Sequence, residues 1–326
     1  MVRVLCGHKI HRTPFLKTAR RKYDKLLQLV GVDQAGPFRI RDPQGRRFFL
    51  LVIDYSTNYT VIYRQRNKSA LSPDLQHFID MAERQHQPNK VVTIIGDGAL
   101  VGYVKSKLEQ LGIQVITTAP GSSESNGKIE RRIRTVVEAA RAMMALAHLP
   151  PTFFLHACVY AVYILNITPD GRNARSKLAP ERNLSALELW QNQDLGSTES
   201  LLKQLRIFGC LAYAILPGVN TVQGKQSKEG ERCVMLGISA NNDKNYQLYS
   251  LDRCKPVEAR SVVTNEILFP YGSPSGAHPT PRPTPGAPDA QDIDLPPQPR
   301  DVQRCWTRLS SGGRKLQALK RCYPTI

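Results

Sequence analysis

Three short apolar runs come first along the chain, and helical and strand-like segments alternate after them. The three runs, at 26–32, 48–53 and 60–63, are the candidates for the first three strands. The segments that follow are a helix at 74–84, a strand at 91–95, a helix at 101–111, a strand at 113–118, and helices at 129–149 and 153–167. This order predicts an α/β domain in which helices cover both faces of a mixed sheet.

The residue pattern changes near residue 205, where short β-rich runs recur between turns. The runs are 207–215, 233–238, 246–251 and 259–269. Their spacing predicts a small antiparallel barrel or meander. The alternative is that these strands extend the first domain.

The chain therefore divides into five predicted regions. A basic lead-in at 1–26 precedes the α/β domain at 27–168, and a polar, irregular connector at 169–204 leads to the β module at 205–269. Residues 270–326 form a Pro-rich linker and a basic tail, which we expect to be disordered.

The charge balance points to a polyanionic partner. Lys and Arg number 45 against 27 Asp and Glu, a formal net charge of +18, which favours nucleic acid over a lipid surface. The alternative is a basic protein without a specific partner. With 41% hydrophobic residues, the chain can build a sizeable core.

Membrane insertion and zinc binding are not expected. No apolar run approaches the ~18–20 residues that a membrane span needs, and the N-terminus turns basic too early for a signal peptide. The seven cysteines include no CxxC pair, which favours reduced thiols in an intracellular protein. Cys6, His8 and His11 lack a second pair of ligands at zinc spacing.

Three acidic residues follow candidate strands or begin a candidate helix. Asp33 ends the first strand, Asp97 follows the strand at 91–95, and Glu130 lies in the first turn of the helix at 129–149. If the first and fourth strands are neighbours, Asp33 and Asp97 emerge side by side, and the helix can bring Glu130 to the same point. Three converging carboxylates suit Mg²⁺ or Mn²⁺ in a two-metal site. The alternatives are helix caps or solvated surface groups, and Glu124 is a competing acid.

Basic residues share a helical stripe with Glu130. At about 100° per residue, Arg134 and Arg141 fall near Glu130 on the helix surface. Lys128, Arg131 and Arg132 crowd the start of the same helix. We predict that Lys128, Arg131, Arg134 and Arg141 contact DNA phosphates. The alternative is a solvated basic face.

Several motifs, in order, resemble the integrases of copia-type retrotransposons. The first half contributes Val32-Asp-Gln-Ala-Gly-Pro37, Val52-Ile-Asp-Tyr-Ser-Thr-Asn-Tyr-Thr60 and Ala119-Pro-Gly-Ser-Ser-Glu-Ser-Asn-Gly-Lys-Ile-Glu-Arg131. The second half contributes Leu187-Glu-Leu-Trp190, Leu205-Arg-Ile-Phe-Gly-Cys210, Cys233-Val-Met-Leu-Gly237 and Asn245-Tyr-Gln-Leu-Tyr249. Their order and separations make the resemblance specific.

The resemblance implies a ribonuclease-H-like fold and a catalytic and metal-binding triad of Asp33, Asp97 and Glu130. It further implies DNA 3′-end processing and strand transfer with Mg²⁺ or Mn²⁺, and DNA, with RNA as a further ligand, as the partner. A homo-oligomer acting in the nucleus is also implied.

Two departures from the family pattern predict weakened catalysis. Gly98-Ala-Leu100 replaces the usual residues after Asp97, and 32 residues separate Asp97 from Glu130, fewer than is typical of the family. Cys6-Gly-His-Lys9 resembles the end of the family's zinc module, whose other ligands do not precede it, so we expect a truncated or degenerate copy. The rival interpretations are a catalytically dead nucleic-acid-binding remnant and a ribonuclease-H-like nuclease of another kind.

Overall fold

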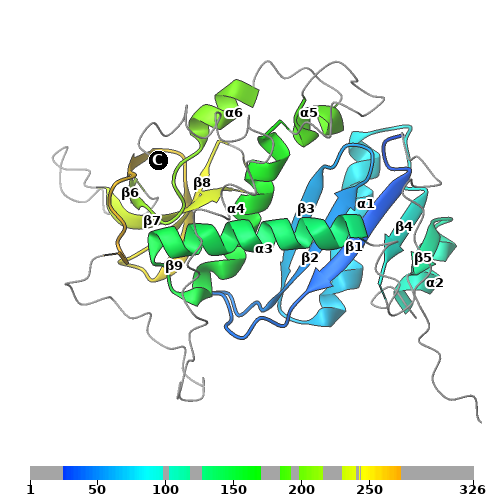
Figure 1. Cartoon of the computed structure of the whole chain (residues 1–326), viewed down its shortest axis with the longest axis horizontal. Helices are drawn as coiled ribbons and strands as arrows, with labels where there is room; N and C mark the ends of the chain where they lie inside the picture. The colour runs from blue at the N-terminus through cyan, green and yellow to red at the C-terminus, as the bar shows by residue number, and fades with distance from the viewer. Residues whose placement is uncertain are drawn as a thin grey trace, which may run out of the picture.

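Two five-stranded sheets and a pair of long helices make up the fold (Figure 1). The computed structural model describes residues 25–97, 103–117, 127–169, 184–191, 198–215, 230–239, 242 and 244–272. The lead-in up to residue 24 and the tail from 273 onward lie outside the described residues, as do Gly98–Leu100 and Glu124.

The first sheet is mixed and has the strand order β3-β2-β1-β4-β5. Its strands are β1 (Leu29–Ala35), β2 (Phe48–Asp54), β3 (Thr60–Gln65), β4 (Thr93–Gly96) and β5 (Gln114–Thr117). β1, β2 and β3 pair antiparallel, whereas β1, β4 and β5 run parallel. The first and fourth strands are therefore neighbours, which is the condition under which Asp33 and Asp97 emerge side by side.

The first strand starts later than its apolar run indicated. Leu27, expected within the strand, has a φ of 62° and lies in a turn, and its amide donates to Oδ1 of Asp54 at 3.1 Å. Leu27 is still fully buried, which explains why the run looked continuous with β1. At its other end, β1 extends to Ala35 because it pairs with β2 as far as Phe49.

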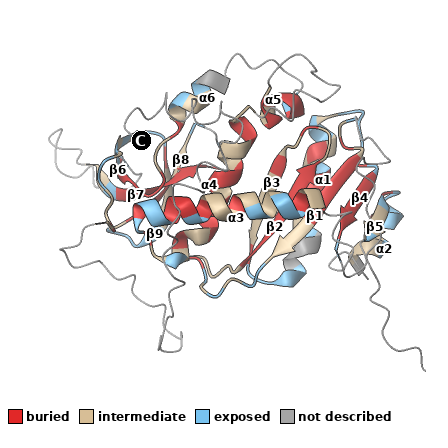
Figure 2. Cartoon of the chain, in the orientation of Figure 1, coloured by how far each residue is buried: buried red, intermediate tan, exposed pale blue. Residues whose placement is uncertain are grey.

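Helices cover both faces of this sheet, as predicted. α1 (Leu71–Gln85) packs on the face that carries Val30 and Val32 of β1 and Leu50 and Val52 of β2. α3 (Gly127–Ala147) and α4 (Phe154–Ile167) pack on the opposite face, and a 3-10 turn (Pro151–Phe153) separates the two helices. β2 is buried along its whole length (Figure 2) because it lies between these layers. α2 (Tyr103–Gln110) packs beside β5, and a short 3-10 helix (Lys68–Ala70) precedes α1.

The second sheet is antiparallel throughout and has the strand order β10-β6-β7-β8-β9. Its strands are β6 (Leu211–Ala214), β7 (Glu231–Ile238), β8 (Tyr246–Ser250), β9 (Lys255–Ala259) and β10 (Val262–Asn265). The last predicted run, 259–269, was placed too far along the chain. It divides into the end of β9 and β10, because β9 pairs with β8 while β10 crosses to pair with β6.

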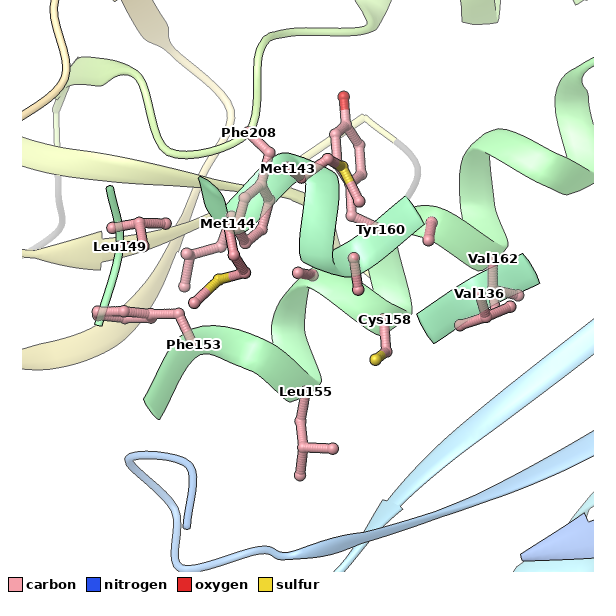
Figure 3. Packing of buried hydrophobic residues seen from close by; sticks show 14 of the residues in the cluster. Val136, Met143, Met144, Leu149, Phe153, Leu155, Cys158, Tyr160, Val162 and Phe208 are labelled. Carbon is pink, nitrogen blue, oxygen red and sulfur yellow. The ribbon is translucent and has the colours of Figure 1, made fainter. Parts of the chain in front are cut away.

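The two sheets share one hydrophobic core, in which α4 is central. Tyr160 of α4 stacks near Phe208, and its hydroxyl donates to the carbonyl of Arg206 at 2.7 Å (Figure 3). Val234 and Leu236 of β7 belong to the same cluster as Phe49 of β2. The boundaries 27–168 and 205–269 remain predictions, but side chains pack continuously between the two regions.

Two glycines allow this close packing. Gly209 has a φ of 83°, and a Cβ there would collide with the side chain of Ala147 at the end of α3. Gly237 has a φ of 124°, and its Cβ would meet the Tyr160 ring at 2.7 Å. Both positions need glycine for conformation and for space.

The connector contains two helices. The motif at 187–190, which the sequence analysis identified, lies in the first of them. α5 (Ala186–Gln191) begins at a capping box, in which Ser185 Oγ accepts from the amide of Glu188 and the Glu188 carboxylate accepts from the amide of Ser185. Trp190 then packs with Tyr59 and Phe78. α6 (Thr198–Gln204) lies where an irregular segment was expected, and Leu201 and Leu202 pack on the shared core. In the described part of the chain, no helix is long and apolar enough to cross a membrane.

Candidate catalytic carboxylate site

Asp33 and Asp97 lie on neighbouring parallel strands at matching positions. Val32 of β1 pairs with Gly96 of β4, and each aspartate is the next residue of its chain. This adjacency meets the condition set in the sequence analysis, which placed Asp33 at the end of the strand. Asp33 instead lies within β1, paired with Leu51 of β2 and one residue beyond the last pair with β4.

Both aspartates belong to the face of the sheet covered by α3. Val30 and Val32 point toward α1, so the alternation of side chains along a strand puts Asp33 on the opposite face. Ile94 also packs on the α1 side, and the same alternation carries Asp97 to the α3 face. Asp33 is partly buried and Asp97 is exposed.

Glu130 joins them from the first turn of α3, the helix that crosses β1 and β2 (Figure 1). Its neighbour Ile129 is fully buried and anchors this turn, while the Glu130 side chain is exposed. The pKa of Asp33 is raised to about 6, first by burial, then by the negative charge of Asp97 and more weakly by that of Glu130. The amide of Gln34 partly opposes this by hydrogen bonding to the carboxylate. The structure thus brings the three carboxylates into one electrostatic cluster.

The donor chemistry of the cluster suits a hard divalent cation, but its shape is open. Carboxylate oxygens are preferred ligands of Mg²⁺, and a cation would relieve the repulsion that raises the Asp33 pKa. Among the residues that the structure describes, however, no three His, Cys, Asp or Glu side chains are arranged to hold a metal ion.

Two of the basic residues at the start of α3 fasten the helix to the turn between β2 and β3. Lys128 Nζ donates to the carbonyl of Tyr55 at 2.5 Å and lies 4.6 Å from the centre of the Tyr55 ring. Arg132 Nη2 donates to the carbonyl of Asn58 at 3.3 Å. These contacts fix the position of the first turn of α3, which carries Glu130. The sequence analysis did not predict this positioning role.

The other basic residues of α3 lie at its surface. Arg131, Arg134 and Arg141 are all exposed, as is Glu130, so the predicted stripe faces solvent. Arg131 Nε donates to the carbonyl of Gly127 at 2.7 Å and is folded along its own helix. Arg134 and Arg141 form no ion pair with any residue in the described ranges.

Comparison with known proteins shows that the chain is similar to part of several transposon polyproteins. No family model matches it. It is 28% identical over 262 residues to the retrovirus-related Pol polyprotein from transposon TNT 1-94 of Nicotiana tabacum, covering 79% of this chain and 18% of the relative. It is also 28% identical over 228 residues to the polyprotein from transposon RE1 of Arabidopsis thaliana, covering 70% of this chain and 14% of the relative. The chain is related to copia-type Pol polyproteins.

The relationship predicted from the motifs is therefore confirmed, although the chain spans less than a fifth of these copia-type relatives. A chain of the cryo-EM structure of the simian T-cell lymphotropic virus intasome in complex with PP2A regulatory subunit B56 gamma also aligns. The alignment covers 79% of this chain and 84% of that chain, at 14% identity and a TM-score of 0.43.

The motif Val52–Thr60 supports the site without contributing to the carboxylate cluster. Asp54 is fully buried, and its Oδ2 accepts from the hydroxyl of Ser56 at 2.6 Å and from the amide and hydroxyl of Thr57 at 2.8 and 2.7 Å. Asn166 of α4 fixes the other end of the turn, accepting from the amide of Thr60 and donating to its carbonyl. These bonds hold the carbonyls that receive Lys128 and Arg132.

Proposed function

We propose that this chain is the catalytic region of a copia-type integrase, with Asp33, Asp97 and Glu130 as its metal-binding and catalytic residues. The observation that carries the proposal is the pairing of Val32 with Gly96, which puts Asp33 and Asp97 on neighbouring parallel strands. Burial, and then the negative charges of Asp97 and Glu130, raise the pKa of Asp33. Such repulsion is common at functional sites that bind cations.

Each part of the cluster has a role in the proposed reaction. Two Mg²⁺ or Mn²⁺ ions would activate the attacking hydroxyl, first of water and then of the element's 3′ end, and stabilise the leaving oxygen. Asp33 and Asp97 provide ligands from a rigid sheet, whereas Glu130 provides one from the helix that Lys128 and Arg132 hold in place. Zinc is not part of the proposal.

DNA is the proposed substrate, and RNA is a further ligand of the same basic surface. The net charge of +18 supports a polyanionic partner, and exposed Arg134 and Arg141 lie on the helix stripe that begins at Glu130. Acting on element ends and target DNA together calls for a homo-oligomer, and the proposed place of action is the nucleus.

The second candidate function is that of a nucleic-acid-binding remnant without catalysis. The open arrangement of the carboxylates favours it, since no metal-binding group of three is formed among the described residues. The altered residues Gly98-Ala-Leu100 also favour it, because phosphoryl transfer requires ligands placed to about 0.5 Å. We therefore expect strand transfer to be weak and DNA binding to be retained.

A strand-transfer assay with a matching element end separates the two candidates. The assay compares wild type with Asp97→Asn in Mg²⁺ and in Mn²⁺, and Arg84→Ala on the opposite face serves as the control. Weak transfer that Asp97→Asn abolishes supports the integrase. DNA binding with no transfer in either metal supports the remnant, and transfer that is equal in wild type and Asp97→Asn contradicts the triad.

The DNA-binding stripe has its own test. Arg134→Ala with Arg141→Ala should weaken DNA binding more than Arg314→Ala with Lys315→Ala, because the first pair lies on the stripe of α3 that begins at Glu130. Equal losses from both pairs would show that the α3 stripe is not the DNA-binding face.

A further inference from the structure

The loop between β1 and β2, which begins three residues after Asp33, carries an excess of positive charge. Residues 36–47 contain four arginines and one acidic residue, Asp42. Two of the arginines, Arg39 and Arg41, are exposed. In Figure 1 the loop extends beyond the lower end of the sheet, toward the first turn of α4. This loop is not part of the α3 stripe, so the predicted DNA contacts on α3 do not account for its positive charge.

Backbone hydrogen bonds hold the loop as an extension of the β1–β2 pair. The amide of Phe38 donates to the carbonyl of Arg47 at 2.7 Å, and the amide of Asp42 donates to the carbonyl of Arg46 at 2.8 Å. The amide of Arg47 donates to the carbonyl of Gln65 at the end of β3. These hydrogen bonds therefore fix the backbone of the loop that carries the arginines.

On the inner side of the loop, the negative charge of Asp42 is balanced by hydrogen bonds and by an ion pair within the protein. Asp42 is 5% exposed, and Oδ1 of its carboxylate accepts from the amides of Gln44 and Arg46 at 2.9 and 2.8 Å. Oδ2 accepts from Nη1 of Arg64 at 3.1 Å. Arg64 is thus satisfied within the protein.

An aromatic contact fixes which residues face outward. The Phe38 ring packs against Phe49 and Phe154, with ring centroids 5.6 and 5.2 Å apart. Phe38 and Asp42 face inward, whereas Arg39 and Arg41, which lie between them in the chain, are exposed.

The loop lies within reach of a DNA strand held at the carboxylates. Arg39 follows Asp33 by six residues, and six extended residues span at most about 20 Å. One DNA strand places a phosphate about every 3.4 Å along the helix axis, so this distance corresponds to about six phosphates. A strand seated at Asp33 would reach Arg39 and Arg41 within about one turn of duplex.

We propose that Arg39 and Arg41 form a second phosphate-binding surface, which holds the DNA strand that extends from the Asp33–Asp97–Glu130 cluster. This inference rests on the proposed function, since it assumes that DNA occupies the cluster. An ordered loop that presents two exposed guanidinium groups matches the repeating phosphates of a nucleic-acid backbone. The surface would add affinity without reading sequence, because it contacts no bases.

The test measures DNA affinity as a function of salt concentration. Fluorescence anisotropy with a labelled 25-base-pair duplex compares wild type, Arg39→Ala with Arg41→Ala, and a control that removes the same charge, Arg84→Ala with Arg260→Ala. Both control residues are exposed and lie on α1 and after β9. Loss of two phosphate contacts should reduce the slope of log Kd against log salt by about 2 in the loop variant. The control should keep the wild-type slope.

The outcomes separate the loop from the proposed function. A loop variant whose slope falls while its thermal midpoint stays at the wild-type value supports the inference. A loop variant with the wild-type slope overturns it and leaves the proposed function standing. A wild-type chain without salt-dependent affinity for DNA overturns both. Equal reductions in the loop variant and the control would show a general effect of net charge and would also overturn the inference.

Discussion

Asp33 and Asp97 stand side by side because Val32 and Gly96, the residues that precede them, pair across two parallel strands. This relationship puts two carboxylates on one face of the sheet, where they repel each other. The repulsion has measurable consequences for stability and for metal binding.

Replacing Asp33 by Asn should stabilise the protein in the absence of metal. The change removes a partly buried charge that lies near two other carboxylates, and we expect the free energy of unfolding to rise by about 1 kcal/mol once solvent screening is allowed for. Thermal unfolding in EDTA measures it. Mn²⁺ should raise the midpoint of wild type more than that of Asp33→Asn, because only wild type keeps all three proposed cation ligands. A midpoint that Mn²⁺ raises equally in both proteins would contradict the assignment of Asp33.

His156 should make the protein less stable as the pH falls below neutral. Burial and the positive charges of Arg64 and Arg46 hold the pKa of His156 well below its usual value, so the unfolded chain binds a proton that the folded chain rejects. The free energy of unfolding should therefore fall below about pH 6.5, by at most about 1.4 kcal/mol per pH unit from this group. Urea unfolding between pH 7.5 and 5 measures the slope.

The His156→Gln variant isolates this contribution. Its amide oxygen can still accept from Nη1 of Arg64, which in wild type lies 2.5 Å from Nε2 of His156. Asp33 acts in the opposite direction, because its raised pKa favours the folded state at low pH, but it is present in both proteins. The free energy of unfolding should fall less steeply with decreasing pH in the variant than in wild type. Equal slopes in the two proteins would contradict the prediction.

Asp42→Asn should destabilise the fold and the β1–β2 loop. The change leaves Arg64 buried beside a neutral group, and breaking a buried pair by removing one partner costs about 3 kcal/mol. Urea unfolding of the purified variant gives the loss. Glu109→Gln is the matched control, since it removes an exposed charge 3.8 Å from Lys105 and should cost less than about 0.5 kcal/mol. Similar losses in the two variants would show that Asp42 is not a structural anchor.

Gly209→Ala should destabilise the protein by disturbing the contact between the segment that precedes β6 and the end of α3. The added methyl group meets Ala147 at a backbone conformation that other residues rarely adopt, and we expect a loss of about 2–3 kcal/mol. Differential scanning calorimetry measures the change. Gly127→Ala is the comparison, because a Cβ there has open space around it. A Gly209 variant as stable as the Gly127 variant would show that the contact can relax.

Much of the fold could be predicted from the sequence because its signals are local. Strand and helix patterns give the order of elements, whereas the neighbouring position of β1 and β4 is a result of the tertiary structure. The exact bounds could not be predicted in the same way. Leu27 is as apolar as a strand residue but lies in a turn, because its amide donates to Asp54, 27 residues away.

The candidate site shows the same division. The sequence by itself singled out Asp33, Asp97 and Glu130 as the acids near candidate strand ends or at the start of a helix, since turn residues and periodicity mark those places. The tertiary structure decided that Asp33 lies within its strand, that Lys128 and Arg132 fasten α3 to the β2–β3 turn, and that Asp42 and His156 converge on Arg64. These contacts join positions 22 to 92 residues apart. Such pairs depend on how the helices cross the sheet, and that crossing is set by packing of the whole core, which no local pattern encodes.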